Sequence, residues 1–474
     1  MANLAFDFES VGPVSKAQIE LRGLTVITGG NNTGKTYLAH SVFGLLSRIE
    51  RASRIPTLFV RRNFLGGDDD VINSAVEQID RGGEARLRMD ELRHYINPIL
   101  ESISQSFSQR YDRAFGGGAD TLADAKVTVT AEVLDFNALE GLEVMFHRGR
   151  SAPVLSLRYD HLDQTLVYEA LEGFADSDPE TVKLWVTMSV GSTLLRLVAP
   201  GLFISSAERT GVVIFQREWD HSRSNLIEAI AEVPDAEHRS ALVSEHVQRY
   251  PAAVGANVDF IRSLPDLPQQ PSDLLRACPE IENLLNQIVG GGYDASSNQL
   301  NYVGESVSLP VAASSSTTRS LVDLWFYLMR VAKKGDVLII DEPELNLHPQ
   351  NQRLLARLLA LVHNQGLQIL ITTHSDYIVR ELSALVSLSQ LGEHAPEEVE
   401  LTLSGQGITR QMALRAETLN VYSTSFPSSG TVSEVEVTKE GIEPTTFDDV
   451  ISAQNELSDM VAWGADVEAD SNLD

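Results

Sequence analysis

Apolar residues along the chain fall into a pattern that predicts a mixed α/β protein. Three short runs are almost continuously apolar, which is typical of strands buried on both faces of a parallel sheet. Each is followed, after a loop, by a segment with apolar residues at helical spacing. The strand runs are 24–28, 336–340 and 368–372, and the helical segments are 37–49, 350–363 and a segment from Asp376 onward. This alternation predicts a parallel core sheet covered by helices.

The remaining segments predict insertions around that core. Short alternating runs in 126–170 predict an antiparallel meander, and GLFISS (201–206) predicts a further strand. Helical spacing covers 71–113, 180–198, most of 222–290 and 319–332, with short strands at 293–303. Toward the C-terminus we expect a strand pair near 401–403 and 432–438, then an amphipathic helix over Thr446–Trp463.

Charge limits the classes of partner. The 474 residues include 66 acidic and 37 basic side chains, for a net charge of −29, which argues against non-specific coating of nucleic acid. Residues 391–474 hold 17 acidic against 3 basic residues, so this acidic C-terminal region carries −14 of the total. A single cysteine, Cys278, excludes an internal disulfide and a cysteine-rich zinc site. With no signal peptide and no apolar stretch long enough to span a membrane, we expect a cytoplasmic protein.

The most specific motif is GGNNTGKT, which matches the G-x-x-x-x-G-K-[ST] phosphate loop and lies between a predicted strand and a predicted helix. A chance glycine turn is the alternative, but the flanking elements are those that nucleotide binding requires. Glycines let backbone N–H groups turn toward an anion, and the helix N-terminus adds a favourable dipole. Lys35 is expected to reach the β- and γ-phosphates, and the Thr36 hydroxyl to bind Mg²⁺. The other residues expected to bind the nucleotide are Gly29, Asn31, Asn32, Thr33 and Gly34.

Two further motifs stand at predicted strand ends, where ligands bind in parallel sheets. In VLIIDEPELNLHP, Asp341 is placed to hold Mg²⁺ and Glu342 to orient and deprotonate an attacking water. In LQILITTHSD, His374 is placed to contact the γ-phosphate or that water. An acidic pair or a histidine at a strand end is often only a surface feature. Their order after the phosphate loop favours a catalytic role.

Together, G-x-N-N-T-G-K-T, D-E-P-E-x-N-L-H-P and T-T-H-S resemble the ABC-class ATPase heads of the SMC-like, RecF-like and OLD-family branch. The resemblance implies a P-loop NTPase of ABC type, with ATP and Mg²⁺ as ligands. It also implies head-to-tail dimers, in which a signature segment of one subunit completes the site of the other. Ser315 and Ser316 stand at the matching position, although they depart from the family's L-S-G-G pattern. The departure puts rapid turnover in doubt, so the expected ATPase is slow or dependent on a trigger.

The resemblance also divides the chain. It implies an ATPase lobe over 1–60 and 180–222, a helical insertion over 61–125, an antiparallel β subdomain over 126–179, a helical subdomain over 223–290, a second ATPase part over 291–390 and the acidic C-terminal region over 391–474. In FISSAERTG, Arg209 is expected either to contact nucleotide or the dimer interface, or to be a salt-bridged structural arginine. Gln216 is the candidate for the glutamine of the lobe-coupling loop.

The parts that are missing from the sequence shape the functional hypotheses. It has no long heptad arm, and no set of carboxylates after His374 that fits an OLD-type nuclease. The chain therefore resembles the stand-alone ATPase subunits of bacterial anti-phage systems, which hold and release a separate effector, a nuclease or a toxin. The helix over Thr446–Trp463 either docks that effector or packs on the ATPase lobe. A RecF/SMC-like DNA-repair ATPase that clamps DNA is the alternative, and a transporter subunit is a weaker one.

Overall fold

The computed structural model describes residues 2–54, 70–117, 122–149, 152–199, 201–215, 250–296, 299–391, 395–424, 430–442 and 460. A six-stranded sheet lies at its centre, in the order β16-β15-β3-β14-β13-β9. All pairs are parallel except that of β15 with β16. The strands are β3 (Leu24–Gly29), β9 (Leu202–Ser205), β13 (Val337–Asp341), β14 (Gln368–Thr373), β15 (Leu419–Thr424) and β16 (Val432–Val435). The predicted parallel core is confirmed, with β15 as a strand that the pattern did not predict.

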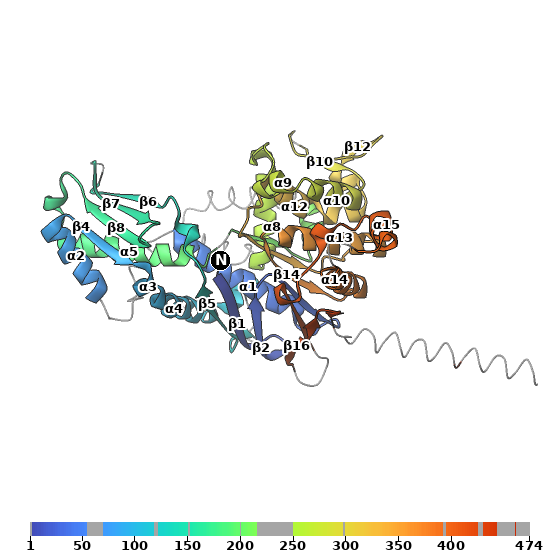
Figure 1. Cartoon of the computed structure of the whole chain (residues 1–474), viewed down its shortest axis with the longest axis horizontal. Helices are drawn as coiled ribbons and strands as arrows, with labels where there is room; N and C mark the ends of the chain where they lie inside the picture. The colour runs from blue at the N-terminus through green and yellow to red at the C-terminus, as the bar shows by residue number, and fades with distance from the viewer. Residues whose placement is uncertain are drawn as a thin grey trace, which may run out of the picture.

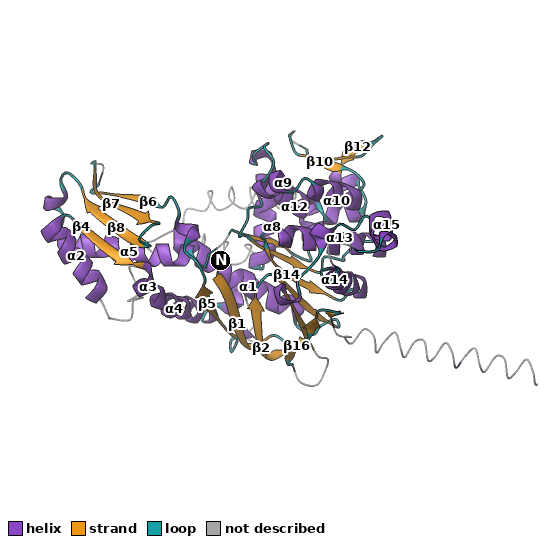
Figure 2. Ribbon diagram, in the orientation of Figure 1, coloured by secondary structure: helices purple, strands orange, loops and turns teal. Residues whose placement is uncertain are grey.

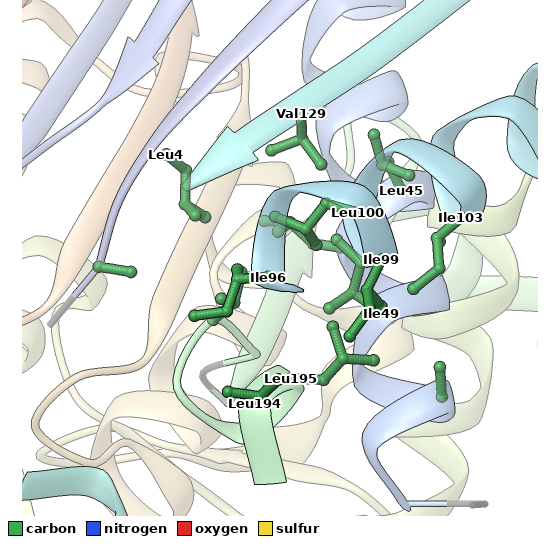
Figure 3. Packing of buried hydrophobic residues seen from close by; sticks show 14 of the residues in the cluster. Leu4, Leu45, Ile49, Ile96, Ile99, Leu100, Ile103, Val129, Leu194 and Leu195 are labelled. Atoms are coloured by element: carbon green, nitrogen blue, oxygen red, sulfur yellow. The ribbon is translucent and has the colours of Figure 1, made fainter. Parts of the chain in front are cut away.

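Two apolar clusters cover the two faces of this sheet, because successive side chains of a strand point to opposite faces. In β13, Val337 and Ile339 belong to the first cluster, whereas Leu338 and Ile340 belong to the second. Helices α1 (Lys35–Arg54), α4 (Ile96–Ser108) and α5 (Pro179–Arg196) supply the first cluster. Figure 3 shows part of it, with side chains of α1, α4 and α5 packed together beside Leu4 and Val129.

The second cluster consists mainly of helices. These are α8 (Ala252–Ser263), α9 (Asp273–Ala277), α10 (Glu280–Val289), α12 (Val322–Phe326), α13 (Pro349–Asn364) and α14 (Asp376–Leu388). The short polar helix α11 (Ser316–Ser320) precedes α12. Near them lie α15 (Glu397–Gly405) and the small sheet of β10 (Gly292–Asp294), β11 (Asn301–Val303) and β12 (Ser308–Pro310). The predicted single helix over 319–332 is instead α11, α12 and a π-helical turn, Tyr327–Val331.

Antiparallel strands extend the first cluster. Strands β1 (Ala2–Val11), β2 (Val14–Leu21) and β5 (Lys126–Val133) form one sheet, in the order β2-β1-β5. Strands β4 (Glu84–Arg88), β6 (Glu143–His147), β7 (Pro153–Asp160) and β8 (Thr165–Ala170) form another, in the order β4-β8-β7-β6. The second of these sheets lies with α2 (Asp70–Gly82) and α5 at one end of the long axis, away from α9–α14 (Figures 1 and 2).

Three secondary-structure predictions need correction. The segment 71–113 is not helical throughout, because β4 and the short α3 (Met89–Leu92) separate α2 from α4. The meander over 126–170 is split, since β5 pairs with β1 while β6, β7 and β8 pair with one another. Residues 401–403 lie in the helix α15, not in a strand.

The C-terminal part of the described chain is built into the fold. β15 pairs with β3, and the hairpin of β17 (Val437–Thr438) and β18 (Gly441–Ile442) packs on α14 through a hydrogen bond from Ile442 N to Ser383 Oγ (2.9 Å). Apart from Met460, the predicted helix over Thr446–Trp463 lies outside the described residues. Within the described part, no helix has the length and apolar character needed to cross a membrane.

Candidate nucleotide site

Three neighbouring strands of the central sheet bring the three motifs to one edge. The phosphate loop follows β3, the acidic pair ends β13, and His374 follows β14, which lies between the other two strands. The register places Asp341 opposite Thr372, and Thr373 opposite Thr28. The phosphate loop, with Thr36 some 305 residues before Asp341, is therefore adjacent in space to the acidic pair and to His374.

The phosphate loop depends on glycine at two positions. Gly29 has φ of +145° and Gly34 of +99°, conformations that residues with a side chain rarely adopt. A Cβ on Gly29 would lie 2.1 Å from Thr424 Oγ1, and one on Gly34 would lie 2.6 Å from Val14 Cγ2. The loop is thus held closely between β2 and β15. Helix α1 starts at Lys35, which directs its N-terminal N–H groups toward the loop.

Lys35 is folded into the loop. Its Nζ donates to the carbonyl oxygens of Gly29 (3.0 Å) and Gly30 (2.7 Å), and the residue is 4% exposed. Burial lowers the pKa of this ammonium group, while the carboxylates of Glu342 and Glu344 act in the opposite direction. The cation is therefore already placed between the loop and the acidic motif, where phosphate charge would be neutralised.

Asp341 is fully buried beneath the loop. Its Oδ1 accepts hydrogen bonds from Thr36 Oγ1 (3.2 Å) and from Thr372 Oγ1. Its Oδ2 lies 3.5 Å from His40 Nε2, and neither of these two atoms has a hydrogen-bond partner within the described chain. Burial acts to raise the pKa of Asp341, but the hydrogen bonds and the nearby His40 hold it below its usual value.

These residues fit a magnesium ion. Mg²⁺ prefers oxygen ligands and usually takes only one or two from the protein. A buried carboxylate oxygen of Asp341 without a hydrogen-bond partner, beside the Thr36 hydroxyl, is the donor set that such an ion requires. His40 was not predicted as part of this site. Its signal in the sequence is its position one helical turn after Thr36, on the same face of α1.

Glu342 and His374 stand at the mouth of the site. Glu342 has φ of +50°, and its N–H donates to Thr372 O (3.1 Å), so the chain turns sharply as it leaves β13. The Glu342 side chain is 24% exposed, with Oε1 3.8 Å from His374 Nδ1. His374 Nδ1 is closer, at 3.1 Å, to Oε1 of Glu344, a buried residue of the same motif to which the sequence assigned no role.

A cleft of about 610 Å³ collects these groups. Its lining contains Pro13, Asn31, Asn32, Thr33, Gly34, Lys35, Thr36, Tyr37, Glu342 and His374. Most of the predicted site residues thus share one cleft, and Asp341 lies beneath it. Thr33 is fixed by hydrogen bonds from its hydroxyl to Gly30 O (2.8 Å) and with Thr424 Oγ1 (2.5 Å).

Ser315 and Ser316 are not among the residues that line this cleft. Ser315 caps α11, with its Oγ accepting from Thr318 N (3.1 Å), and both serines are exposed. The neighbouring Thr317 donates to Asn346 O (2.6 Å), which ties α11 to the loop after the acidic pair. That Ser315 and Ser316 complete the nucleotide site of a second subunit stays a prediction.

Arg209 is a buried structural residue within the chain. Its guanidinium donates to Ser320 O (2.9 Å), Ser206 O (2.9 Å), Asp341 O (2.8 Å) and Glu342 O (2.8 Å). It is 3% exposed and forms no ion pair within 4.0 Å in the described part of the chain. Within this chain Arg209 therefore has the structural role that was one of the two expectations, but it binds backbone carbonyls instead of forming a salt bridge. Gln216 lies outside the described residues.

Parts of the chain are similar in sequence to known ATP-binding proteins. Residues 223–379 match the family model of an AAA ATPase domain, a range that contains Asp341, Glu342 and His374 but not the phosphate loop. A protein of Methanothermobacter thermautotrophicus, named as an ABC transporter ATP-binding protein, is 24% identical over 262 residues, which cover 53% of this chain and 80% of the relative.

Solved structures with partial similarity include SMC heads. A crystal structure of the SMC head bound to the C-winged helix domain of ScpA has a TM-score of 0.35 at 10% identity, covering 92% of this chain and 98% of that one. The SMC head domain from Thermotoga maritima has a TM-score of 0.29 at 8% identity, covering 92% and 100%. The cleft geometry, the domain match and the ATP-binding relative together support an ABC-like P-loop ATPase.

Proposed function

We propose that the chain binds ATP with Mg²⁺ and hydrolyses it to ADP and phosphate. The observation that carries the proposal is the convergence of Lys35, Glu342 and His374 on one cleft, with the unsatisfied oxygen of Asp341 beneath it. A cation, a candidate base and metal-binding oxygens are the parts that phosphoryl transfer to water requires.

Each residue then has a distinct task. Backbone N–H groups of the loop and Lys35 bind the phosphate oxygens, and Thr36 and Asp341 hold Mg²⁺. When bound, the ion supplies positive charge that stabilises the phosphate oxygens. Glu342 accepts a proton from the attacking water, and His374 binds the water or the γ-phosphate. Because the Glu342 side chain is 24% exposed and lines the cleft, it can reach a water bound there.

Glu342→Gln tests this assignment. The variant keeps the size and hydrogen-bonding capacity of the side chain but removes the base, so we expect hydrolysis to fall about 10²–10⁴-fold with ATP binding retained. ATP should also stay trapped, which stabilises the dimer. The matched control is Glu140→Gln, an exposed glutamate in another part of the chain. Unchanged hydrolysis in Glu342→Gln would remove Glu342 from its role as base.

At the level of the assembly, we propose a head-to-tail homodimer, or a larger homo-oligomer, that senses infection and holds a separate effector protein. The signature-like Ser315 and Ser316 are exposed and lie outside the cleft of their own chain, which suits donation to a second subunit. The charge of −14 in the acidic C-terminal region suits a basic protein partner better than DNA.

Co-purification tests this second proposal. We expect the product of a neighbouring gene to co-purify with the chain, and protection against phage to depend on both Lys35 and Glu342. The mass of the complex would give the number of subunits. If the protein instead binds bare duplex DNA in an ATP-dependent, salt-sensitive manner with no protein partner, the DNA-clamping alternative replaces the effector-holding role.

A further inference from the structure

Glu344 is a buried carboxylate that the proposed chemistry does not use. It lies in the loop after β13, is 5% exposed, and points to the end of β14. Its Oε1 accepts hydrogen bonds from His374 N (2.6 Å) and Thr373 Oγ1 (2.9 Å). Glu344 thus joins the loop after the acidic pair to the residue that faces the cleft.

The same carboxylate oxygen also lies beside the imidazole of His374. Nδ1 of the ring is buried and stands 3.1 Å from Glu344 Oε1, compared with 3.8 Å from Glu342 Oε1. The approach to Glu344 is an electrostatic contact, because Nδ1 makes no hydrogen bond of acceptable geometry within the described part of the chain. The side chain as a whole is nevertheless 40% exposed and lines the cleft. Since Nδ1 itself is covered, the exposed part of the side chain lies elsewhere on the ring.

The charges at this point constrain the ring. A carboxylate close to one imidazole nitrogen favours a proton on that nitrogen, and so decides which nitrogen is free for chemistry. Burial raises the pKa of Glu344 overall, although the backbone N–H of His374 and the nearby imidazole act in the opposite direction. A carboxylate in this position acts on His374 electrostatically as well as through the backbone.

We infer that Glu344 is a positioning residue, which holds the proton of His374 on Nδ1 and presents Nε2 to the γ-phosphate or the attacking water. This inference rests on the proposed ATP hydrolysis. The two carboxylates of the motif then have different roles, because Glu342 acts on the attacking water and Glu344 acts on His374. The contrasting possibility is that Glu344 only anchors the end of β14.

The tautomer of His374 is measurable without any hydrolysis. In nucleotide-free protein labelled with ¹⁵N-histidine, long-range ¹H–¹⁵N spectra distinguish the two tautomers, and His374→Ala assigns the signals. We expect the Nδ1–H form in the wild type and a shift toward Nε2–H in Glu344→Gln. The matched control is Glu381→Gln, which alters an equally buried carboxylate that pairs with Arg357. It should leave the His374 signals unchanged.

Kinetics give the second readout. In Glu344→Gln we expect kcat for ATP to fall about tenfold or more, with KM changed less than about threefold. If Glu344 acts through the ring, the double variant with His374→Ala should be no slower than His374→Ala alone. Multiplying effects in the double variant, or an unchanged tautomer in Glu344→Gln, would overturn the inference. A wild type that hydrolyses no ATP would refute the proposed function, and the tautomer measurement would still decide the role of Glu344.

Discussion

Replacing Arg209 with alanine should destabilise the fold around the nucleotide site. The guanidinium satisfies four backbone carbonyls that belong to three separate segments: the turn after β9, the end of β13 and the end of α11. It is also the cation that acts on the buried Asp323, whose pKa burial raises and Arg209 lowers. One substitution therefore removes the guanidinium donors from several buried carbonyls and the nearby cation from Asp323, which keeps its hydrogen bonds from Asn257 and Leu324.

The size of the effect follows from that count. A hydrogen bond to a buried polar group contributes about 1 kcal/mol, and leaving the group unsatisfied costs about 1–3 kcal/mol. Water that enters the site recovers part of this loss. We therefore expect the free energy of unfolding to fall by about 3–5 kcal/mol, as when one partner is removed from a buried charged network.

Urea unfolding measures this loss. Trp325 lies in the second apolar cluster, on the same helix as Asp323, and Trp185 packs on the first cluster, so tryptophan fluorescence reports on both. The control is Arg196→Ala, an exposed arginine at the end of α5, which should change the free energy by less than about 0.5 kcal/mol. Arg209→Lys should fall between the two, because lysine keeps the charge but loses the fork of donors. A loss below about 1 kcal/mol in Arg209→Ala would refute the reasoning.

Four further predictions concern the phosphate loop, the α11 serines and the half-buried His363. Lys35→Ala should weaken ATP binding at least tenfold in titration calorimetry, because it removes the one loop cation; equal affinity would contradict its role. Gly34→Ala should weaken ATP binding too, since its Cβ would collide with Val14; unchanged affinity would show that the loop can shift at no cost. Replacing both Ser315 and Ser316 with alanine should slow hydrolysis in the assembled protein but leave ATP binding to the monomer intact, and no effect on the dimer would place the signature elsewhere. Burial lowers the pKa of His363, so the unfolded chain binds its proton more readily than the folded chain does. The contribution of His363 to the free energy of unfolding should therefore be complete above about pH 6.5 and decline below that pH. His363→Gln should reduce the difference in the free energy of unfolding between pH 5 and pH 8, measured by urea melts.

The parallel core was predictable because its strands are short apolar runs with no competing interpretation. The phosphate loop was equally clear, because the positive φ angles of Gly29 and Gly34 strongly favour glycine, and this makes the motif visible in the sequence. β4 was missed because it has only five residues, with Ala85 and Leu87 inward and charged residues outward, between two helices. Leu401 and Leu403 alternate as in a strand, yet they lie in a helix, with Leu401 66% exposed. Two residues of alternation are too few to specify a strand.

Within the site, the sequence indicated residues whose role follows from a motif, and missed those whose role follows from contact. Asp341 and Glu342 are adjacent and end a buried strand, so their position alone was informative. The roles of His40 and Glu344 become visible only when α1 and β14 are packed beside β13. Arg209 was noticed, but its four carbonyl partners come from segments up to 133 residues away, which no local pattern reveals.

The place of β15 changes how experiments on the acidic C-terminal region must be designed. A deletion from residue 391 would remove the acidic region, but it would also remove β15, which pairs with β3, and the Thr424 hydroxyl that contacts Thr33. Loss of a partner in such a truncation would then report a damaged nucleotide site instead of a missing docking surface. Only cuts beyond Ile442 separate the two. Conversely, Val432–Ile442 connects whatever follows in the chain to β15, whose Thr424 hydroxyl contacts Thr33 of the phosphate loop, so a variant at Thr424 would test whether the two ends are coupled.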